Sequence, residues 1–292
     1  MVTKSSNKSY VTRISSPVSR HLFLGMDFLI EPRELLEQAR QSDVVILDTR
    51  KPAEYAKGHI PRAINFSAYD LFALDTSPAG LSAFARELAV RYAAAGVSNS
   101  RPVVVYEMDT GMRAARDAWI LQYVGHPRVS LLHGGLAAWR AAGCNLSSDV
   151  ADDWTVGLRV RERSGMVIGF EEIAGRLGRD GLTLLDVRDA DEHAGRDNTA
   201  CCARRGTIPG SVWIEWTQFL DGGRFKSPEA IRGLLSESGV DLESEIVPYC
   251  HRGARSANTY YALQHAGFPK VRNYIGSWHE WSSRPELPVE RP

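Results

Sequence analysis

The sequence has no long apolar run, few cysteines and no net charge. None of its apolar runs approaches the eighteen or more residues of a membrane-spanning helix. Lysine plus arginine equals aspartate plus glutamate, 35 of each, so no overall field favours nucleic acid or an anionic membrane. Four cysteines in 292 residues, without a CxxC motif, argue against a disulfide scaffold and a spaced zinc motif. These absences favour a globular protein in a reducing compartment, which we take to be the cytoplasm.

The N-terminal segment is basic and rich in serine up to the first acidic residue, Asp27. That composition fits a disordered lead or a cleaved transit peptide, and it lacks the apolar core of a signal peptide. We expect a disordered lead over residues 1–21. The alternative, a cleaved lead, would place the protein in the mitochondrial matrix.

Four sequence blocks occur twice, in the same order. This pattern predicts one domain duplicated, because the period is far too long for a solenoid. We expect a first domain at 22–144, a linker at 145–165 and a second domain at 166–292. The paired blocks are "VVILDTR" (44–50) with "LTLLDVR" (182–188), "GHIPRAIN" (58–65) with "GTIPGSVW" (206–213), "VVVYE" (103–107) with "IVPYC" (246–250), and "GHPRVSLLHGGLAAW" (125–139) with "GFPKVRNYIGSWHEW" (267–281).

Each copy alternates short apolar runs with segments of helical spacing. The apolar runs at 44–48, 102–106, 182–186 and 245–249 predict buried strands. Segments at 34–40, 114–125, 170–178 and 256–267 predict helices, two of them ending at Gly125 and Gly267. The fold class is therefore α/β, with a mostly parallel sheet in each copy and helices on both faces. Ligands in such sheets bind at the carboxyl ends of strands, which is where Cys250 lies.

The two copies differ at that strand end. Glu107 stands where the second copy has Cys250, which predicts an inactive first domain and an active second one. The second copy also carries an insert, "DEHAGRDNTACCARRG" (191–206), which we expect at the surface near the active loop.

The residues after Cys250 predict an activated thiol. Helix N-termini and nearby cations lower the pKa of a cysteine, and the thiolate is the nucleophile. Main-chain N–H groups of residues 251–255 can point at the sulfur, and Gly253 permits the tight wrap that this needs. Arg252 and Arg255 add positive charge that can bind an anionic substrate.

The chain resembles the tandem-domain rhodanese family, the thiosulfate and 3-mercaptopyruvate sulfurtransferases. The resemblance covers almost the whole chain beyond about residue 22. It implies that Cys250 carries a sulfane sulfur as a persulfide, taken from a small anionic donor and passed to cyanide or a thiol. It implies neither a metal nor an organic cofactor. The motifs that carry it are "LDTRKPAEYAKGHIPRAIN" (47–65), "LLDVR" (184–188) with "GTIPGSV" (206–212), "CHRGAR" (250–255) and "YIGSWHEWSSRPELPVE" (274–290).

The resemblance also assigns the residues around the sulfur. His251, Arg252, Gly253, Ala254 and Arg255 form the cradle of the sulfur and bind the donor.

The DxR motif of the second copy contributes Arg188, which is directed toward the active site in relatives, while Asp186 beside it is structural. A basic loop favours thiosulfate as donor, because a divalent anion needs more positive charge than a monocarboxylate. Mercaptopyruvate remains the alternative donor.

Other residues have simpler interpretations. The adjacent Cys201 and Cys202 are incidentally exposed rather than a metal pair, and Cys144 is a packing residue. His59 and the tryptophans are core or rim residues, with Trp278 a possible pocket residue.

Two further functions stay open. A phosphatase or arsenate reductase would need its arginine six positions after the cysteine, whereas Arg255 is five after and Ser256 is the sixth. A persulfide carrier in a protein sulfur relay would use the inactive domain as a docking surface.

Overall fold

The computed structural model describes residues 28–149, 156–179, 181–197, 202 and 204–292. The expected N-terminal lead and Cys201 lie outside this part of the chain. No helix of the described residues is long and apolar enough to cross a membrane.

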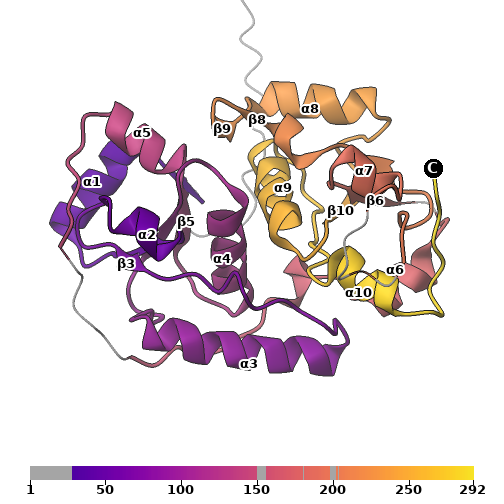
Figure 1. The fold of residues 1–292 in the computed structure, drawn as a ribbon, viewed down its shortest axis with the longest axis horizontal. Coiled ribbons are helices and arrows are strands. Elements are labelled where there is room, and N and C mark those ends of the chain that lie inside the picture. The colour runs from indigo at the N-terminus through magenta and orange to yellow at the C-terminus, as the bar shows by residue number, and fades with distance from the viewer. Residues whose placement is uncertain (1–27, 150–155, 180, 198–201, 203) are drawn as a thin grey trace, which may run out of the picture.

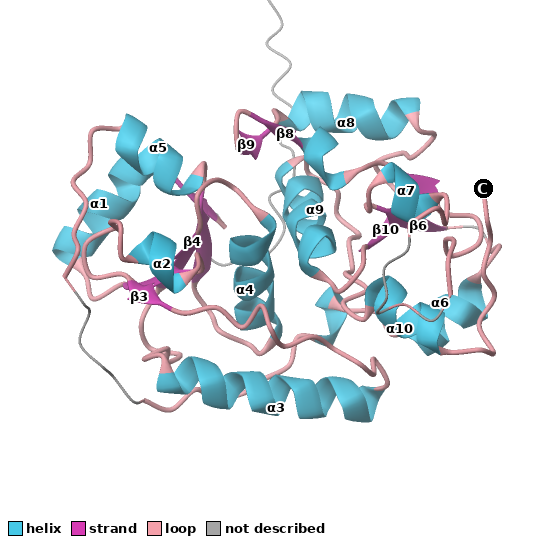
Figure 2. Ribbon diagram, in the orientation of Figure 1, coloured by secondary structure: helices cyan, strands magenta, loops and turns pink. Residues whose placement is uncertain are grey.

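The first domain is a five-stranded parallel sheet with helices on both faces (Figures 1 and 2). The strand order is β1-β5-β4-β2-β3, and every adjacent pair is parallel. The central strands are buried at every residue, as expected where helices cover both faces. Its elements are β1 (Leu29–Ile30), α1 (Pro32–Gln41), β2 (Val45–Asp48), α2 (Pro52–Tyr55), β3 (Ile64–Asn65), α3 (Pro78–Ala94), β4 (Val103–Tyr106), α4 (Met112–Tyr123), β5 (Val129–Leu132) and α5 (Gly135–Ala141).

The second domain repeats this arrangement. Its parallel strands follow the order β10-β6-β7, which matches β4-β2-β3 of the first domain. Parallel bridges from Ile246 to Val271 and from Val167 to Asn273 continue the sheet where β5 and β1 stand in the first domain. Its elements are a short 3₁₀ helix (Ser164–Met166), α6 (Phe170–Arg176), β6 (Leu182–Asp186), α7 (Ala190–His193), β7 (Val212–Trp213), a second 3₁₀ helix (Trp216–Phe219), β8 (Leu220–Asp221), β9 (Arg224–Phe225), α8 (Pro228–Glu237), β10 (Glu245–Tyr249), α9 (Ala254–His265) and α10 (Ser277–Ser283).

The predicted fold class is confirmed. Strands form at each of the four apolar runs and helices at each of the four segments of helical spacing. Gly125 and Gly267 follow α4 and α9 with φ of 95° and 87°, the left-handed conformation that ends many helices.

The two domains pack through equivalent helices. Helix α4 lies against α9, side by side at the centre of Figure 1, and one apolar core continues across this contact. Polar contacts join the domains as well: Asn258 donates to the carbonyl oxygen of Thr110 at 2.9 Å, and Glu280 accepts from the main-chain N–H of Thr76 at 2.7 Å. Because α4 and α9 each follow the loop at the carboxyl end of a central strand, this packing brings the two loops together.

Candidate active site

Cys250 lies in the turn between β10 and α9, at the carboxyl end of a central strand. Gly253 makes this turn possible, because its φ is 85° and a Cβ there would lie 2.5 Å from the carbonyl oxygen of Ile275. The expected position of the cysteine, between a buried strand and a helix N-terminus, is confirmed.

The sulfur of Cys250 is surrounded by hydrogen-bond donors. The main-chain N–H of Gly253 donates to Sγ at 3.1 Å, and the hydroxyls of Ser256 and Ser277 lie 3.7 and 3.9 Å from it. Ser277 also accepts from the main-chain N–H of Cys250 at 3.1 Å, and it holds a φ of 56°, unusual for a residue with a Cβ. The sequence reasoning missed both serines. Ser256 had a signal, its place in the first turn of the helix after the loop, whereas Ser277 comes from a distant segment.

This environment lowers the pKa of Cys250. Burial of the thiol raises its pKa, but the charge of Arg255 and hydrogen bonds from the amide and hydroxyl of Ser256 together outweigh that effect. The side chain is only 1% exposed, yet it lines a cavity of about 590 Å³. The sulfur is thus buried and still open to a small molecule.

The loop residues His251, Arg252 and Ala254 line the same cavity. Arg252 lies 4.2 Å from the ring centre of Phe72, a residue of the first domain. The buried Nε of Arg252 has no hydrogen-bond partner among the described residues. Burial, followed by the charge of Arg252, lowers the pKa of His251 to about 4, so this imidazole is neutral at pH 7.

Arg255 lines the cavity but is already paired. Its guanidinium binds both carboxylate oxygens of Glu192 in α7, one of them at 2.9 Å. The side chains are only 16% and 11% exposed, so the pair is largely shielded from solvent. Glu192 belongs to the insert, which therefore does approach the active loop. The sequence reasoning did not single out this carboxylate, which offsets much of the charge expected from Arg255.

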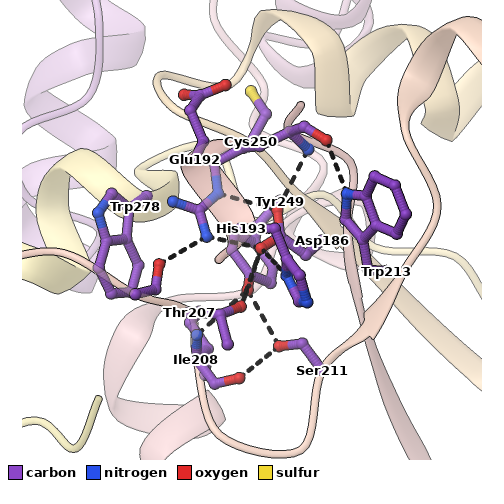
Figure 3. Close-up of polar contacts among 12 residues, drawn as sticks. Asp186, Glu192, His193, Thr207, Ile208, Ser211, Trp213, Tyr249, Cys250 and Trp278 are labelled. Atoms are coloured by element: carbon purple, nitrogen blue, oxygen red, sulfur yellow. Dashed lines mark hydrogen bonds and ion pairs between the residues drawn. The ribbon is translucent and has the colours of Figure 1, made fainter. Parts of the chain in front are cut away.

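Arg188 is held just after the carboxyl end of β6 and is not among the residues that line the cavity around Cys250. It binds Asp186 through Nε at 2.9 Å and through a terminal nitrogen at 2.6 Å, and it donates to the carbonyl oxygen of Gly206 at 2.8 Å. Its guanidinium also stacks 4.7 Å from the ring centre of Trp278. Figure 3 shows this network around Asp186, whose carboxylate is also hydrogen-bonded to Nδ1 of His193 at 2.9 Å.

The first domain contains the same motif without a thiol. Arg50 binds Asp48 at 2.6 Å and the carbonyl oxygen of Gly58 at 2.9 Å. The shared geometry indicates a structural role, because in both domains the arginine of the DxR motif links the aspartate to a glycine carbonyl oxygen. The structure supports the structural interpretation of Asp186, whereas a part for Arg188 in donor binding stays a prediction.

The first domain supplies about half of the cavity. The guanidinium of Arg116 reaches it from α4 and donates to the carbonyl oxygens of Ala68 and Leu71, which fixes the loop that carries the other first-domain residues. The sequence reasoning placed all donor-binding residues in the second domain, because spacing along the chain does not reveal contacts between domains. The cavity is lined by Tyr69, Asp70, Phe72, Met112 and Arg116 of the first domain and by Trp216, Cys250, His251, Arg252, Ala254 and Arg255 of the second.

Glu107 fills the anion cradle of the first domain. Its carboxylate accepts from the main-chain N–H groups of Arg113 and Ala114, at 2.7 and 3.1 Å, as Sγ of Cys250 accepts from Gly253. Burial raises the pKa of Glu107 to about 7, even though these two hydrogen bonds oppose the rise. The glutamate therefore takes the position that the thiolate has in the second domain, as expected for a domain that has lost its reactive cysteine.

The remaining residues of the sequence interpretation are placed as follows. His59 and Trp139 are buried in the core, and Cys144 packs against the same cluster. Trp278 is buried beside Arg188 rather than at the cavity of Cys250. Cys202 is half-buried, while Cys201 lies outside the described residues, so the interpretation of this pair stays a prediction.

Comparisons with known proteins agree with this geometry. The family described as "Rhodanese-like domain" matches residues 31–142 and 170–284. A relative from Azotobacter vinelandii named "Thiosulfate sulfurtransferase" is 33% identical, over 92% of this chain and 98% of its own. A relative from Pseudomonas aeruginosa named "Probable 3-mercaptopyruvate sulfurtransferase" is 32% identical, over 89% of this chain and 97% of its own.

Solved structures show the same fold. The anaerobic ergothioneine biosynthesis enzyme from Chlorobium limicola, in complex with trimethyl histidine, superposes with a TM-score of 0.75 at 21% identity. The superposition covers 90% of this chain and 70% of that one. At this identity the likeness concerns the fold alone.

Proposed function

Because this chain belongs to the family of rhodanese-like domains, we propose that it is a sulfurtransferase that carries sulfur on Cys250 and prefers thiosulfate as donor. One observation carries the proposal: the sulfur of Cys250 has a lowered pKa and lies in a cavity lined by arginines. A thiolate in such a place is a nucleophile beside a binding site for a small anion.

The reaction needs no oxidant beyond the donor itself. The thiolate of Cys250 attacks the outer sulfur of thiosulfate, the S–S bond of the donor breaks, and sulfite leaves with the electron pair. The persulfide on Cys250 then meets cyanide or a thiolate, which attacks the outer sulfur and forms thiocyanate or a new persulfide. That second step returns the thiolate of Cys250. The amide of Gly253 and the hydroxyls of Ser256 and Ser277 stabilise the anionic sulfur at each stage.

Charge in the cavity supports the preference for thiosulfate. Glu192 offsets Arg255, but the lining also holds Arg116 and Arg252 against a single carboxylate, that of Asp70, which pairs with Arg91 at 3.3 Å. The relatives named for thiosulfate and for 3-mercaptopyruvate have similar identity, so the preference rests on these side chains. A dianion gains more from them than a monocarboxylate does.

Two measurements test the proposal. Incubation with thiosulfate should add the mass of one sulfur atom to the wild type and none to Cys250→Ala. With cyanide as acceptor, kcat/KM should be higher for thiosulfate than for mercaptopyruvate, and Arg252→Gly should lower it about tenfold or more for thiosulfate and less for mercaptopyruvate. Arg179→Gly, at an exposed position outside the cavity lining, is the matched control.

The outcomes separate the alternatives. The opposite ranking of donors in Arg252→Gly would show that loop charge does not set donor preference. Phosphatase turnover without a sulfur adduct would favour the phosphatase. Negligible turnover with small donors, together with rapid persulfide uptake from a desulfurase, would favour the carrier.

A further inference from the structure

Three metal-ligating side chains meet beside the active loop. Ring nitrogens of His251 and His279 and the Sγ of Cys202 all lie within 4.8 Å of one another. Cys202 belongs to the insert, His251 follows the catalytic cysteine, and His279 lies in α10. Because these segments are far apart in the sequence, the cluster has no spacing motif.

The fold holds the two imidazoles in place. The main-chain N–H of His279 donates to the carbonyl oxygen of His251 at 3.0 Å, so the two backbones are joined. The rings lie 6.0 Å apart at 73°, and the ring of His279 also meets Phe72 edge-on at 5.2 Å. Two residues from separate segments are thus fixed with their rings facing a shared space.

One ring nitrogen of the cluster is a buried polar atom without a hydrogen bond among the described residues. Nδ1 of His279 is buried and has no hydrogen-bond partner among the described residues. Leaving such a buried group unsatisfied is unfavourable. A ligand that engages the ring would recover part of that cost, directly or by reorienting the imidazole.

The charge beside the cluster limits the kind of metal ion. Arg252 follows His251 in the loop, and its positive charge opposes an added cation. An anionic ligand is therefore needed for compensation, and the thiolate of Cys202 provides one. This requirement favours a thiophilic ion over a hard one such as Mg²⁺.

The distances are close to those of a zinc site. Zinc binds sulfur at about 2.3 Å and imidazole nitrogen at about 2.0–2.1 Å, which puts tetrahedral ligand atoms roughly 3.3–3.6 Å apart. Rotation about side-chain bonds can close the gap from 4.8 Å to these values. Three protein ligands leave a fourth position for water, as in open zinc sites.

We propose that Cys202, His251 and His279 bind one thiophilic transition-metal ion, with Zn²⁺ as the reference ion, and that its binding inhibits sulfur transfer. The thiol of Cys202 loses its proton to the buffer as the metal–sulfur bond forms. The ion immobilises His251 and blocks the cavity that this residue lines beside Cys250. The inhibition rests on the proposed function, whereas the binding does not.

Zinc titration of the full chain, in competition with a chromophoric chelator and without any sulfur donor, tests the site. We expect one Zn²⁺ per chain. Cys202→Ser and His279→Ala should each weaken binding by more than about tenfold, whereas the matched controls Cys144→Ser and His265→Ala should not. Cys250→Ser should retain the ion, which separates this site from metal capture by the catalytic thiolate.

Cobalt provides an independent readout of the sulfur ligand. Bound Co²⁺ should give a thiolate-to-metal charge-transfer band in the wild type and none in Cys202→Ser. In the turnover assay, Zn²⁺ should inhibit the wild type, a chelator should restore it, and His279→Ala should be active and insensitive. Binding that persists in Cys202→Ser, or that disappears in Cys250→Ser, would overturn the proposal. Failure of the sulfurtransferase assay alone would leave the binding result intact.

Discussion

Glu107 allows a sharp test of the view that the first domain keeps the anion cradle of the second. Its carboxylate accepts two main-chain N–H groups, and burial raises its pKa to about 7. We consider the substitution Glu107→Gln, which keeps the shape of the side chain and an oxygen that accepts from both amides. It removes the negative charge and replaces the other carboxylate oxygen with an amide group.

The sign of the effect follows from the direction of the pKa shift. A carboxyl group whose pKa is higher in the folded state than in the unfolded state stabilises the fold fully below the unfolded pKa. This stability is lost as the pH rises through the folded pKa. Between the ordinary 4.5 and about 7, the folded protein therefore loses stability that the glutamine variant keeps.

The magnitude comes from the same shift. A difference of about 2.5 pH units, at about 1.36 kcal/mol per unit, amounts to about 3 kcal/mol. Because Glu107 is only partly buried, solvent screening reduces the effect, and we expect about 1–3 kcal/mol. For a chain of this size that corresponds to a rise in Tm of roughly 2–5 °C.

Thermal unfolding of wild type and variant at pH 5 and pH 8.5 measures this effect. At pH 5 the two proteins should unfold at nearly the same temperature, because the wild-type carboxyl is protonated in the fold. At pH 8.5 Glu107→Gln should be more stable. Glu37→Gln, at an exposed position of α1, should show no such difference between the two pH values. Equal gains at both pH values, or a less stable variant at pH 8.5, would refute the reasoning.

Two further predictions concern donor binding and the sulfur. Glu192→Gln should lower the KM for thiosulfate roughly fivefold, because Arg255, which lines the cavity, loses an anionic partner worth about 1 kcal/mol. Steady-state kinetics check this, and a raised KM would show that the carboxylate is needed chiefly to position the guanidinium. Ser256→Ala should raise the pKa of Cys250 and slow its alkylation by iodoacetamide at pH 7 by about two- to tenfold, because a hydroxyl near the thiolate is lost. An unchanged pH profile of alkylation would show that the serine does not stabilise the anion.

The sequence alone determined the fold and the position of the reactive thiol. Periodicity of apolar residues places strands and helices through local geometry, and the duplication of four blocks checks one copy against the other. Cys250 could be identified because its strand, its loop glycine and its helix are contiguous in the chain. For the same reason Glu107 was recognised as the residue that replaces the thiol.

Only the tertiary structure decided how charge is distributed around that thiol. Glu192 meets Arg255, and Asp186 holds Arg188, because folding brings side chains together irrespective of the segments between them. Formal charges counted along the chain carry no information about ion-pair partners. The sequence analysis therefore overestimated the net positive charge of the loop after Cys250. Half of the cavity and the cluster of Cys202 with two histidines likewise depend on contacts between separate segments, which no spacing along the chain encodes.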